Sequence, residues 1–171
     1  MRSSARAWSL VLPAVWIGML IAIDGIEAPL KFQAPGITIP LGLGIGRLVF
    51  SALNAAEAVV AIAWLAIALR GRATRRDLLP LGVAGAILVA KIVAIRPLLW
   101  SHTDAVLAGE SSGGSMVHLV YIAADVALGL VLCWAVLRGV RAVSRTAPEA
   151  AELEPAGGRR AEAGAASGAE R

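Results

Sequence analysis

The chain has 171 residues, of which 58% are apolar, and its mean hydropathy is +0.74. Soluble domains use about 45–50% apolar residues, so this composition excludes an ordinary soluble protein and indicates a membrane protein built as one domain. The formal net charge is +4, and the single cysteine, Cys133, excludes an internal disulfide. The sequence contains no internal repeat and no nucleic-acid-binding motif, so no nucleic-acid partner is expected.

Four apolar runs are long enough to cross a bilayer, for which about 20 residues suffice. They cover residues 8–28, 43–69, 78–100 and 116–137. The first run follows Arg2 and Arg6, as the apolar part of a signal peptide would. Its length, Pro13 and the missing A-x-A cleavage pattern favour a retained helix instead. The sequence therefore predicts an all-α, four-transmembrane-helix bundle over residues 1–138.

The segments between these runs have the composition of connections. Residues 29–43 contain three prolines and are predicted to form an apolar loop, because proline interrupts helices. Residues 70–77 form a short basic turn, and residues 101–115 a polar loop in which Thr103 and Asp104 cap a brief helical turn. Residues 139–171 are rich in Ala, Glu, Gly and Arg, and we predict a disordered tail because they cannot bury a core.

The distribution of basic residues predicts the topology. Four spans place both termini on one side of the membrane. That side carries nine arginines: Arg2, Arg6, the four in residues 70–76, Arg138, Arg141 and Arg145. The loops of the other side contain only Lys31. Because Lys and Arg accumulate in cytoplasmic loops, we predict a multi-pass protein of the cytoplasmic (inner) membrane with both termini in the cytoplasm.

Three charged residues lie where a bilayer penalises charge. Glu57, Lys91 and Asp125 each fall near the middle of a separate span. An isolated ion at that depth is costly, so such side chains usually face the bundle interior and pair with one another. We therefore expect these three residues to meet at the centre of the bundle.

Further polar residues of the spans fall in the outer half or on the same helix faces. Lys91 and Arg96 are five residues apart, about 140° on an α-helix, so we expect them on different faces, with Arg96 nearer the surface. His118, Tyr121 and Asp125 form one helix stripe. The full set of candidate ligand- or ion-binding residues is Glu57, Lys91, Asp125, Arg47, Asn54, His118, Tyr121, Asp24, Glu27 and Arg96.

These residues predict a polar site that opens to the outer face and binds or translocates a small polar or anionic solute, an ion or a proton. The inner halves carry almost no ionisable group, which argues against a full pathway through one copy and leaves a homo-oligomer open. The alternative is a structural or partner-binding subunit whose buried charges fix helix packing. A membrane-embedded enzyme or metal site is less favoured, and no cofactor is expected.

The sequence contains no complete motif for a metal site, a catalytic serine or phosphate binding. The metal-ligand candidates His102, Asp104, Glu110 and His118 lack the close spacing of a metal site, and no serine lies in a nucleophile motif. Gly42, Gly44 and Gly46 spell GLGIG, but no strand precedes them. Close helix packing or a flexible start of the helix is therefore a better interpretation of these glycines than phosphate binding.

Four short motifs carry a resemblance: WIG at 16–18, EAPLKF at 27–32, GRLVFSALN at 46–54 and VHLVY at 117–121. With them the chain resembles small bacterial four-helix integral membrane proteins of unknown function, some of which are grouped loosely with copper-resistance-type membrane domains and a eukaryotic transmembrane family. The resemblance covers about residues 10–138. It implies the four-helix fold and no established activity. The sequence lacks the Met or His cluster that a copper site would use.

Overall fold

The computed structural model describes residues 3–110 and 116–168, and within these ranges the secondary structure is helical, without strands. Four helical stretches are long and apolar enough to cross a membrane: Ser4–Gln33, Ile39–Arg70, Arg75–Leu107 and Met116–Ala142. The predicted all-α class and the four apolar helices are confirmed. Each stretch is five to ten residues longer than the sequence suggested.

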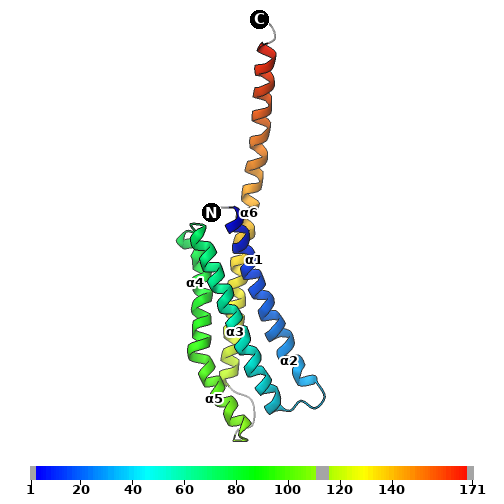
Figure 1. The fold of residues 1–171 in the computed structure, drawn as a ribbon, viewed down its shortest axis with the longest axis vertical. Helices are drawn as coiled ribbons and strands as arrows, with labels where there is room; N and C mark the ends of the chain where they lie inside the picture. The colour runs from blue at the N-terminus through cyan, green and yellow to red at the C-terminus, as the bar shows by residue number, and fades with distance from the viewer. Residues whose placement is uncertain (1–2, 111–115, 169–171) are drawn as a thin grey trace. The chain divides into compact units, whose positions relative to one another are not determined.

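The helices follow one another in a simple up-and-down order (Figure 1). The elements are α1 (Ser3–Leu20), the π-helix η1 (Ile21–Glu27), α2 (Ala28–Leu30), the 3₁₀-helix η2 (Lys31–Gln33), α3 (Ile39–Arg70), α4 (Arg75–Ala90), the π-helix η3 (Lys91–Ile95), α5 (Arg96–Leu107) and α6 (Met116–Gly168). The chain divides into two compact units, Met1–Val136 and Leu137–Arg171. The first unit is the four-helix bundle.

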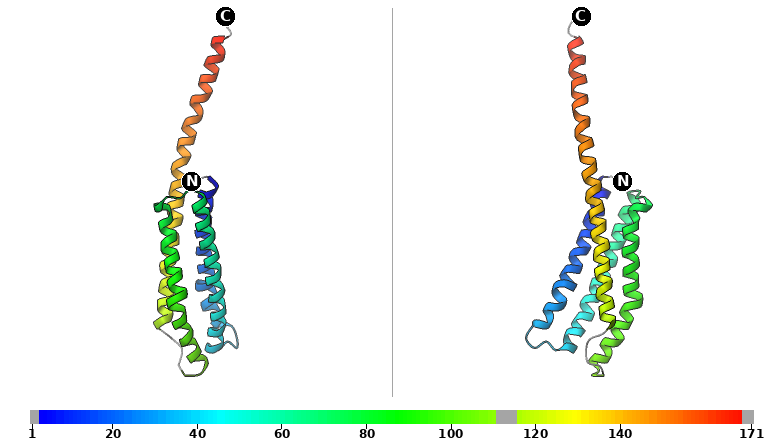
Figure 2. Two further views of the ribbon diagram at one scale, coloured as in Figure 1. Left: turned by 60° about the vertical axis from the view of Figure 1, so that its left-hand side comes forward. Right: turned by 180° about the vertical axis from the view of Figure 1, so that it is seen from behind.

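The connections of the bundle lie at two opposite ends. The start of α1 and the α3–α4 turn lie at one end, whereas η2, the start of α3 and the end of α5 lie at the other (Figures 1 and 2). We call the first the arginine end, because Arg6, Arg70, Arg72, Arg75 and Arg76 lie on these elements. The second is called the pocket end, for reasons given below.

The loop predicted for residues 29–43 is much shorter in the structure. Pro29 and Pro40 lie in the first turns of α2 and α3, where a helix needs no donor from the backbone nitrogen. Thr38 caps α3 by accepting a hydrogen bond from the backbone nitrogen of Leu41. Pro40 therefore lies at the start of α3, Pro29 lies where α2 follows directly on η1, and only residues 34–38 connect the two helical stretches.

The predicted polar loop also begins later than expected. α5 continues through Leu107, so Thr103 and Asp104 are interior helical residues and the capping prediction for them is wrong. The Thr103 hydroxyl donates to the carbonyl of Leu99, 2.9 Å away, and Thr103 is buried. The physical reason is that a hydroxyl can bond the preceding turn of its own helix, so threonine need not end that helix.

The bundle core is apolar toward the arginine end. Buried residues from all four stretches pack there: Trp16, Leu20, Leu53, Trp64, Leu81, Ala84, Leu88, Leu128, Leu132 and Ala135. Many large apolar side chains point outward instead, among them Leu48, Ile62, Val93 and Leu130, each at least 67% exposed. The outside of the bundle is therefore as apolar as a lipid environment would require.

The second unit consists of the C-terminal part of α6, which is helical through Gly168. The sequence predicted disorder for residues 139–171, so the helical backbone differs from that expectation. Ala, Glu and Arg favour helix without needing a packed core, whereas the glycines and prolines of this segment oppose it. The disordered tail stays a prediction.

Candidate functional site

Glu57, Lys91 and Asp125 meet at the centre of the bundle, as their depth in the sequence predicted. The Lys91 ammonium donates to both carboxylate oxygens of Glu57, at 3.4 and 3.3 Å, and to Oδ1 of Asp125. Glu57 and Lys91 are fully buried and Asp125 is 7% exposed. We call these three residues the charge cluster. One lysine therefore links two carboxylates from α3 and α6.

Two further hydrogen bonds extend the charge cluster. The indole nitrogen of Trp16 donates to Oε1 of Glu57 at 2.9 Å, which ties α1 to the centre. The Lys91 ammonium lies 4.9 Å from the centre of the Tyr121 ring, a cation–π distance. The Tyr121 hydroxyl donates in turn to Oδ1 of Asn54 at 3.1 Å. All four spans thus contribute side chains to one polar centre.

The prediction that Lys91 and Arg96 occupy different faces is wrong, because the helix between them is not an α-helix. Residues Lys91–Ile95 form the π-helix η3, and the backbone nitrogen of Arg96 bonds the carbonyl of Lys91. An i→i+5 bond places residues five apart one turn above each other. Lys91 therefore points toward Glu57 and Asp125 at the centre of the bundle, and Arg96 points into the space next to them on the side of the pocket end.

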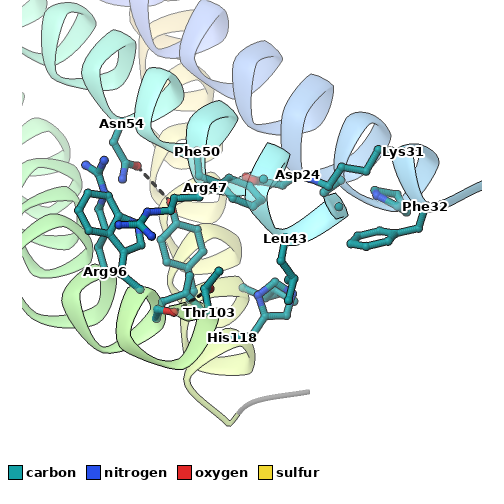
Figure 3. Close-up of a pocket in the computed structure, with 18 residues that line it drawn as sticks. Asp24, Lys31, Phe32, Leu43, Arg47, Phe50, Asn54, Arg96, Thr103 and His118 are labelled. Atoms are coloured by element: carbon teal, nitrogen blue, oxygen red, sulfur yellow. Dashed lines mark hydrogen bonds between the residues drawn. The ribbon is translucent and has the colours of Figure 1, made fainter. Parts of the chain in front are cut away.

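That space is a pocket of about 400 Å³ at the pocket end (Figure 3). Its walls come from η1, α2 and η2, from α3, from α5 and from the start of α6. Asn54 and Tyr121 belong both to the pocket wall and to the bonds around the charge cluster. The charge cluster itself does not line the pocket, so the predicted site consists of two adjoining layers.

Basic side chains and aromatic rings make up much of the pocket wall. Lys31, Arg47 and Arg96 line it, together with Phe32, Phe50, Trp100 and Tyr121. The guanidinium groups of Arg47 and Arg96 lie 4.6 and 4.3 Å from the centre of the Trp100 ring. Figure 3 shows these two arginines next to each other, on α3 and α5. The wall thus combines three cations and the Asp24 carboxylate with largely apolar side chains.

The three basic residues differ in whether an acidic partner neutralises them. Lys31 pairs with Glu27 at 3.2 Å, and Arg47 pairs with Asp104 at 2.6 Å. Arg96 donates to the Ser51 hydroxyl, and within the described ranges it has no carboxylate partner. Its Nε atom is buried and has no hydrogen-bond acceptor among the described residues. Arg96 is therefore the cation of the pocket whose charge is not compensated.

Two other pocket residues carry polar atoms without a partner. Oδ2 of Asp24 and Nδ2 of Asn54 are buried, and neither forms a hydrogen bond with the part of the chain that the structure describes. Asn54 is 1% exposed. Leaving a buried polar group unpaired costs about 1–3 kcal/mol, so three such atoms around one pocket indicate that polar atoms of a ligand or water belong there.

Most predicted site residues lie in one of these two layers. Asp24, Arg47, Asn54, Arg96, His118 and Tyr121 line the pocket. Glu27 does not line it and contacts it only through Lys31. The sequence analysis missed Lys31, Phe50 and Trp100, which looked like loop or ordinary apolar residues. A signal was present, because Lys31 is the only basic residue of its loop.

The glycines at 42 and 46 shape one pocket wall. A Cβ at Gly42 would collide with the Phe32 ring, and one at Gly46 would lie 3.1 Å from the Lys31 ammonium. A Cβ at Gly44 would meet nothing within 4 Å. Two of the three glycines thus allow Phe32 and Lys31 to lie against α3, which agrees with the interpretation of GLGIG as a packing motif.

The candidate metal ligands are not brought together. No group of three His, Cys, Asp or Glu side chains able to hold a metal occurs among residues 3–110 and 116–142. Asp104 is engaged by Arg47, and His118 lines the pocket.

Comparison of the chain with protein-family models, with curated protein sequences and with solved structures finds no match. The resemblance to small four-helix membrane proteins therefore remains an expectation, and the function is argued from the pocket.

Proposed function

We propose that this protein is a four-span integral membrane protein with both termini in the cytoplasm. In this proposal, the pocket opens to the non-cytoplasmic side and binds a small molecule that has an anionic group and an apolar body. The bound group contacts Arg96, and the apolar body contacts the aromatic wall. The proposal concerns binding, and any transport would follow from it.

The outer surface of the bundle supports the membrane assignment. Four stretches have the length and hydropathy of membrane spans, and large apolar side chains cover their outward faces. A soluble monomer rarely exposes a continuous apolar patch of more than a few hundred Å², because water would drive such surfaces together. Lipid removes that penalty, so the bilayer is the partner that this surface fits best.

The two ends of the bundle support the orientation. Arg6, Arg70, Arg72, Arg75 and Arg76 lie at the arginine end. Because Lys and Arg accumulate on the cytoplasmic side, this end is assigned to the cytoplasm and the pocket end to the opposite side. A ligand would then enter from outside the cytoplasm.

The single observation that carries the ligand assignment is Arg96. It lines the pocket, has a buried Nε without an acceptor, and has no carboxylate partner among the described residues. An uncompensated guanidinium in a largely apolar wall favours a carboxylate, phosphate or sulfonate, with which it forms short charge-assisted hydrogen bonds. The volume of about 400 Å³ fits a molecule of modest size.

The test uses the purified full-length chain in lipid nanodiscs and two probes that differ in one group. 3-Phenylpropionate carries the anion, and 3-phenylpropanol replaces it with a hydroxyl. We expect only the propionate to raise the melting temperature, and Arg96→Gln to weaken its binding at least about tenfold, the minimum expected for a lost bond to a charged group. Arg76→Gln, at the arginine end, is the matched control and should bind normally.

Two results would contradict the proposal. One is an equal response to the two probes, which would indicate unspecific uptake by apolar surfaces. The other is a propionate response that Arg96→Gln leaves unchanged, which would place the anion elsewhere.

The charge cluster favours a second, structural role within the same protein. The charge cluster lies behind the pocket wall, where Glu57 and Asp125 each pair with Lys91. Paired and enclosed in this way, they fix the relative rotation of three helices. The structural alternative therefore describes the charge cluster, while the ligand-binding proposal describes the pocket above it.

A further inference from the structure

We infer that the ligand of this pocket is a zwitterion, with an ammonium group that Asp24 binds and an anionic group that Arg96 binds. The inference rests on the proposed function, since it adds a second charged group to the same ligand. Amino acids with an apolar body are the simplest molecules of this class.

Asp24 is an acidic residue of the pocket wall that has no ion-pair partner among the described residues. Asp24 lies in the π-helix η1, lines the pocket, and has a buried Oδ2 atom without a hydrogen-bond donor among the described residues. It forms no ion pair with any residue of residues 3–110 or 116–142. The pocket therefore presents one uncompensated carboxylate and one uncompensated guanidinium. Figure 3 shows them on separate walls, one from η1 and one from α5.

The pocket and the adjoining charge cluster together hold more negative than positive charge. The charge cluster adjoins the pocket that Asp24 lines, because Asn54 and Tyr121 belong to both. Asp24, Glu57 and Asp125 are three carboxylates, whereas Lys91 and Arg96 are the two cations here that no other described carboxylate neutralises. A ligand ammonium at Asp24 would reduce this excess of negative charge, whereas a purely anionic ligand would increase it.

Aromatic rings of the pocket wall can contact both the ammonium group and the apolar body of such a ligand. Phe50 and Tyr121 line the pocket, and their ring centres lie 5.6 Å apart. Aromatic faces attract cations, as the Lys91 ammonium over Tyr121 and the Lys31 ammonium over Phe50 already illustrate. The same rings provide apolar contact for the body of the ligand. A molecule with two opposite charges and a short apolar body thus matches Asp24, Arg96 and the aromatic rings of the wall.

The experiment compares charge types on one scaffold by isothermal titration of the full-length chain in nanodiscs. The zwitterionic probes are free phenylalanine and 4-(aminomethyl)benzoate, which separate the two charges by a short and a longer distance. The singly charged probes are 3-phenylpropionate and phenethylamine. We expect at least one zwitterion to bind about tenfold more tightly than both singly charged probes, because each lost charge leaves a buried protein group unpaired.

Two variants then assign each charge to its partner. Asp24→Asn should abolish the preference for the zwitterion over 3-phenylpropionate, and Arg96→Gln should abolish its preference over phenethylamine. Glu110→Gln is the matched control, because Glu110 is an exposed carboxylate at the pocket end that does not line the pocket. It should keep the wild-type order of affinities. A melting temperature close to that of the wild type shows that each variant is folded.

The outcomes separate this inference from the proposed function. If 3-phenylpropionate binds through Arg96 but neither zwitterion binds more tightly, the inference is wrong and the proposed function stands. If no charged probe binds better than 3-phenylpropanol, both are wrong. If the zwitterion preference survives Asp24→Asn, the ammonium lies elsewhere and the inference is overturned.

Discussion

Lys91 is the residue on which the centre of the bundle depends. It is one of only two lysines in the chain, and it is fully buried between two carboxylates. A buried ion pair contributes little compared with an apolar replacement, but removing one partner leaves the other charge unpaired at a high cost. The protein is therefore expected to be much more sensitive to single changes in the charge cluster than to its complete replacement.

We predict that Lys91→Met destabilises the bundle by about 3–5 kcal/mol, because Glu57 and Asp125 lose their common partner. Thermal unfolding in nanodiscs measures the effect. Lys31→Met is the matched control, since the other lysine has a single pair within one helical segment, a type worth about 0.5 kcal/mol. The combined variant Lys91→Met/Glu57→Gln/Asp125→Asn removes the two unpaired carboxylates and should recover part of the lost stability, while the buried amides keep it below the wild type. A single variant as stable as the wild type would show that the cluster is not structural.

The meeting of Glu57, Lys91 and Asp125 followed from the sequence, because a bilayer leaves an ion at mid-depth few alternatives to pairing. The pocket, in contrast, could not be predicted from the sequence. Whether a paired charge faces a cavity depends on how far the helices separate, and apolar residues such as Phe50 and Trp100 carry no sign of it in a single sequence. Lys31 was missed because a lysine among prolines looks like a loop residue.

At the scale of the element, the two π-helices place charged side chains in the pocket and in the charge cluster next to it. η1 carries Asp24 and precedes Pro29, and η3 carries Lys91 and precedes Pro97. A π-helix adds one residue to a turn and is often found at functional sites. A helical wheel with 100° per residue therefore failed for Lys91 and Arg96. A charged residue followed by proline a few positions later was the available signal.

We predict that deleting Val93, an exposed residue of η3, is tolerated. The deletion converts the wide turn to an ordinary α-helical one and leaves Lys91 and Arg96 on one face. Deleting Val83, an exposed valine in the regular helix α4, is the matched control. It rotates the preceding part of the helix by about 100° relative to Lys91 and should lower the melting temperature sharply. The two deletions having equal effects would refute the role assigned to η3.

The wall formed by the glycines gives a second prediction for an element. Gly42→Ala places a methyl group where the Phe32 ring lies, so the ring must move and the pocket wall changes shape. We expect a loss of about 1–3 kcal/mol, typical of overpacking, together with weaker probe binding. Gly44→Ala meets no neighbouring atom and should be neutral or slightly stabilising, because alanine favours helix. Thermal unfolding and titration of both variants decide the matter.

At the scale of the whole molecule, the orientation is open to direct measurement. Cys133→Ala gives a background without cysteine, since the chain has only one. Single cysteines at Ala34 and Ala108 then report on the pocket end, and one at Ala73 reports on the arginine end. We expect a membrane-impermeant maleimide to label the first two in intact cells and the third only after permeabilisation. The reverse pattern would overturn the assigned topology.

The apolar core between Trp16 and Ala135 has a consequence for kinetics. Within the described bundle, the packed side chains of Trp64, Leu81 and Leu132 fill the space between the charge cluster and the arginine end. In the proposed orientation this core closes the arginine end, so a molecule that enters a single copy from the pocket end leaves from that end. Vesicles containing the protein should therefore retain an amount of solute that saturates near one molecule per chain. A signal that keeps rising with time would mean that the helices separate, or that several copies create a route that one copy lacks.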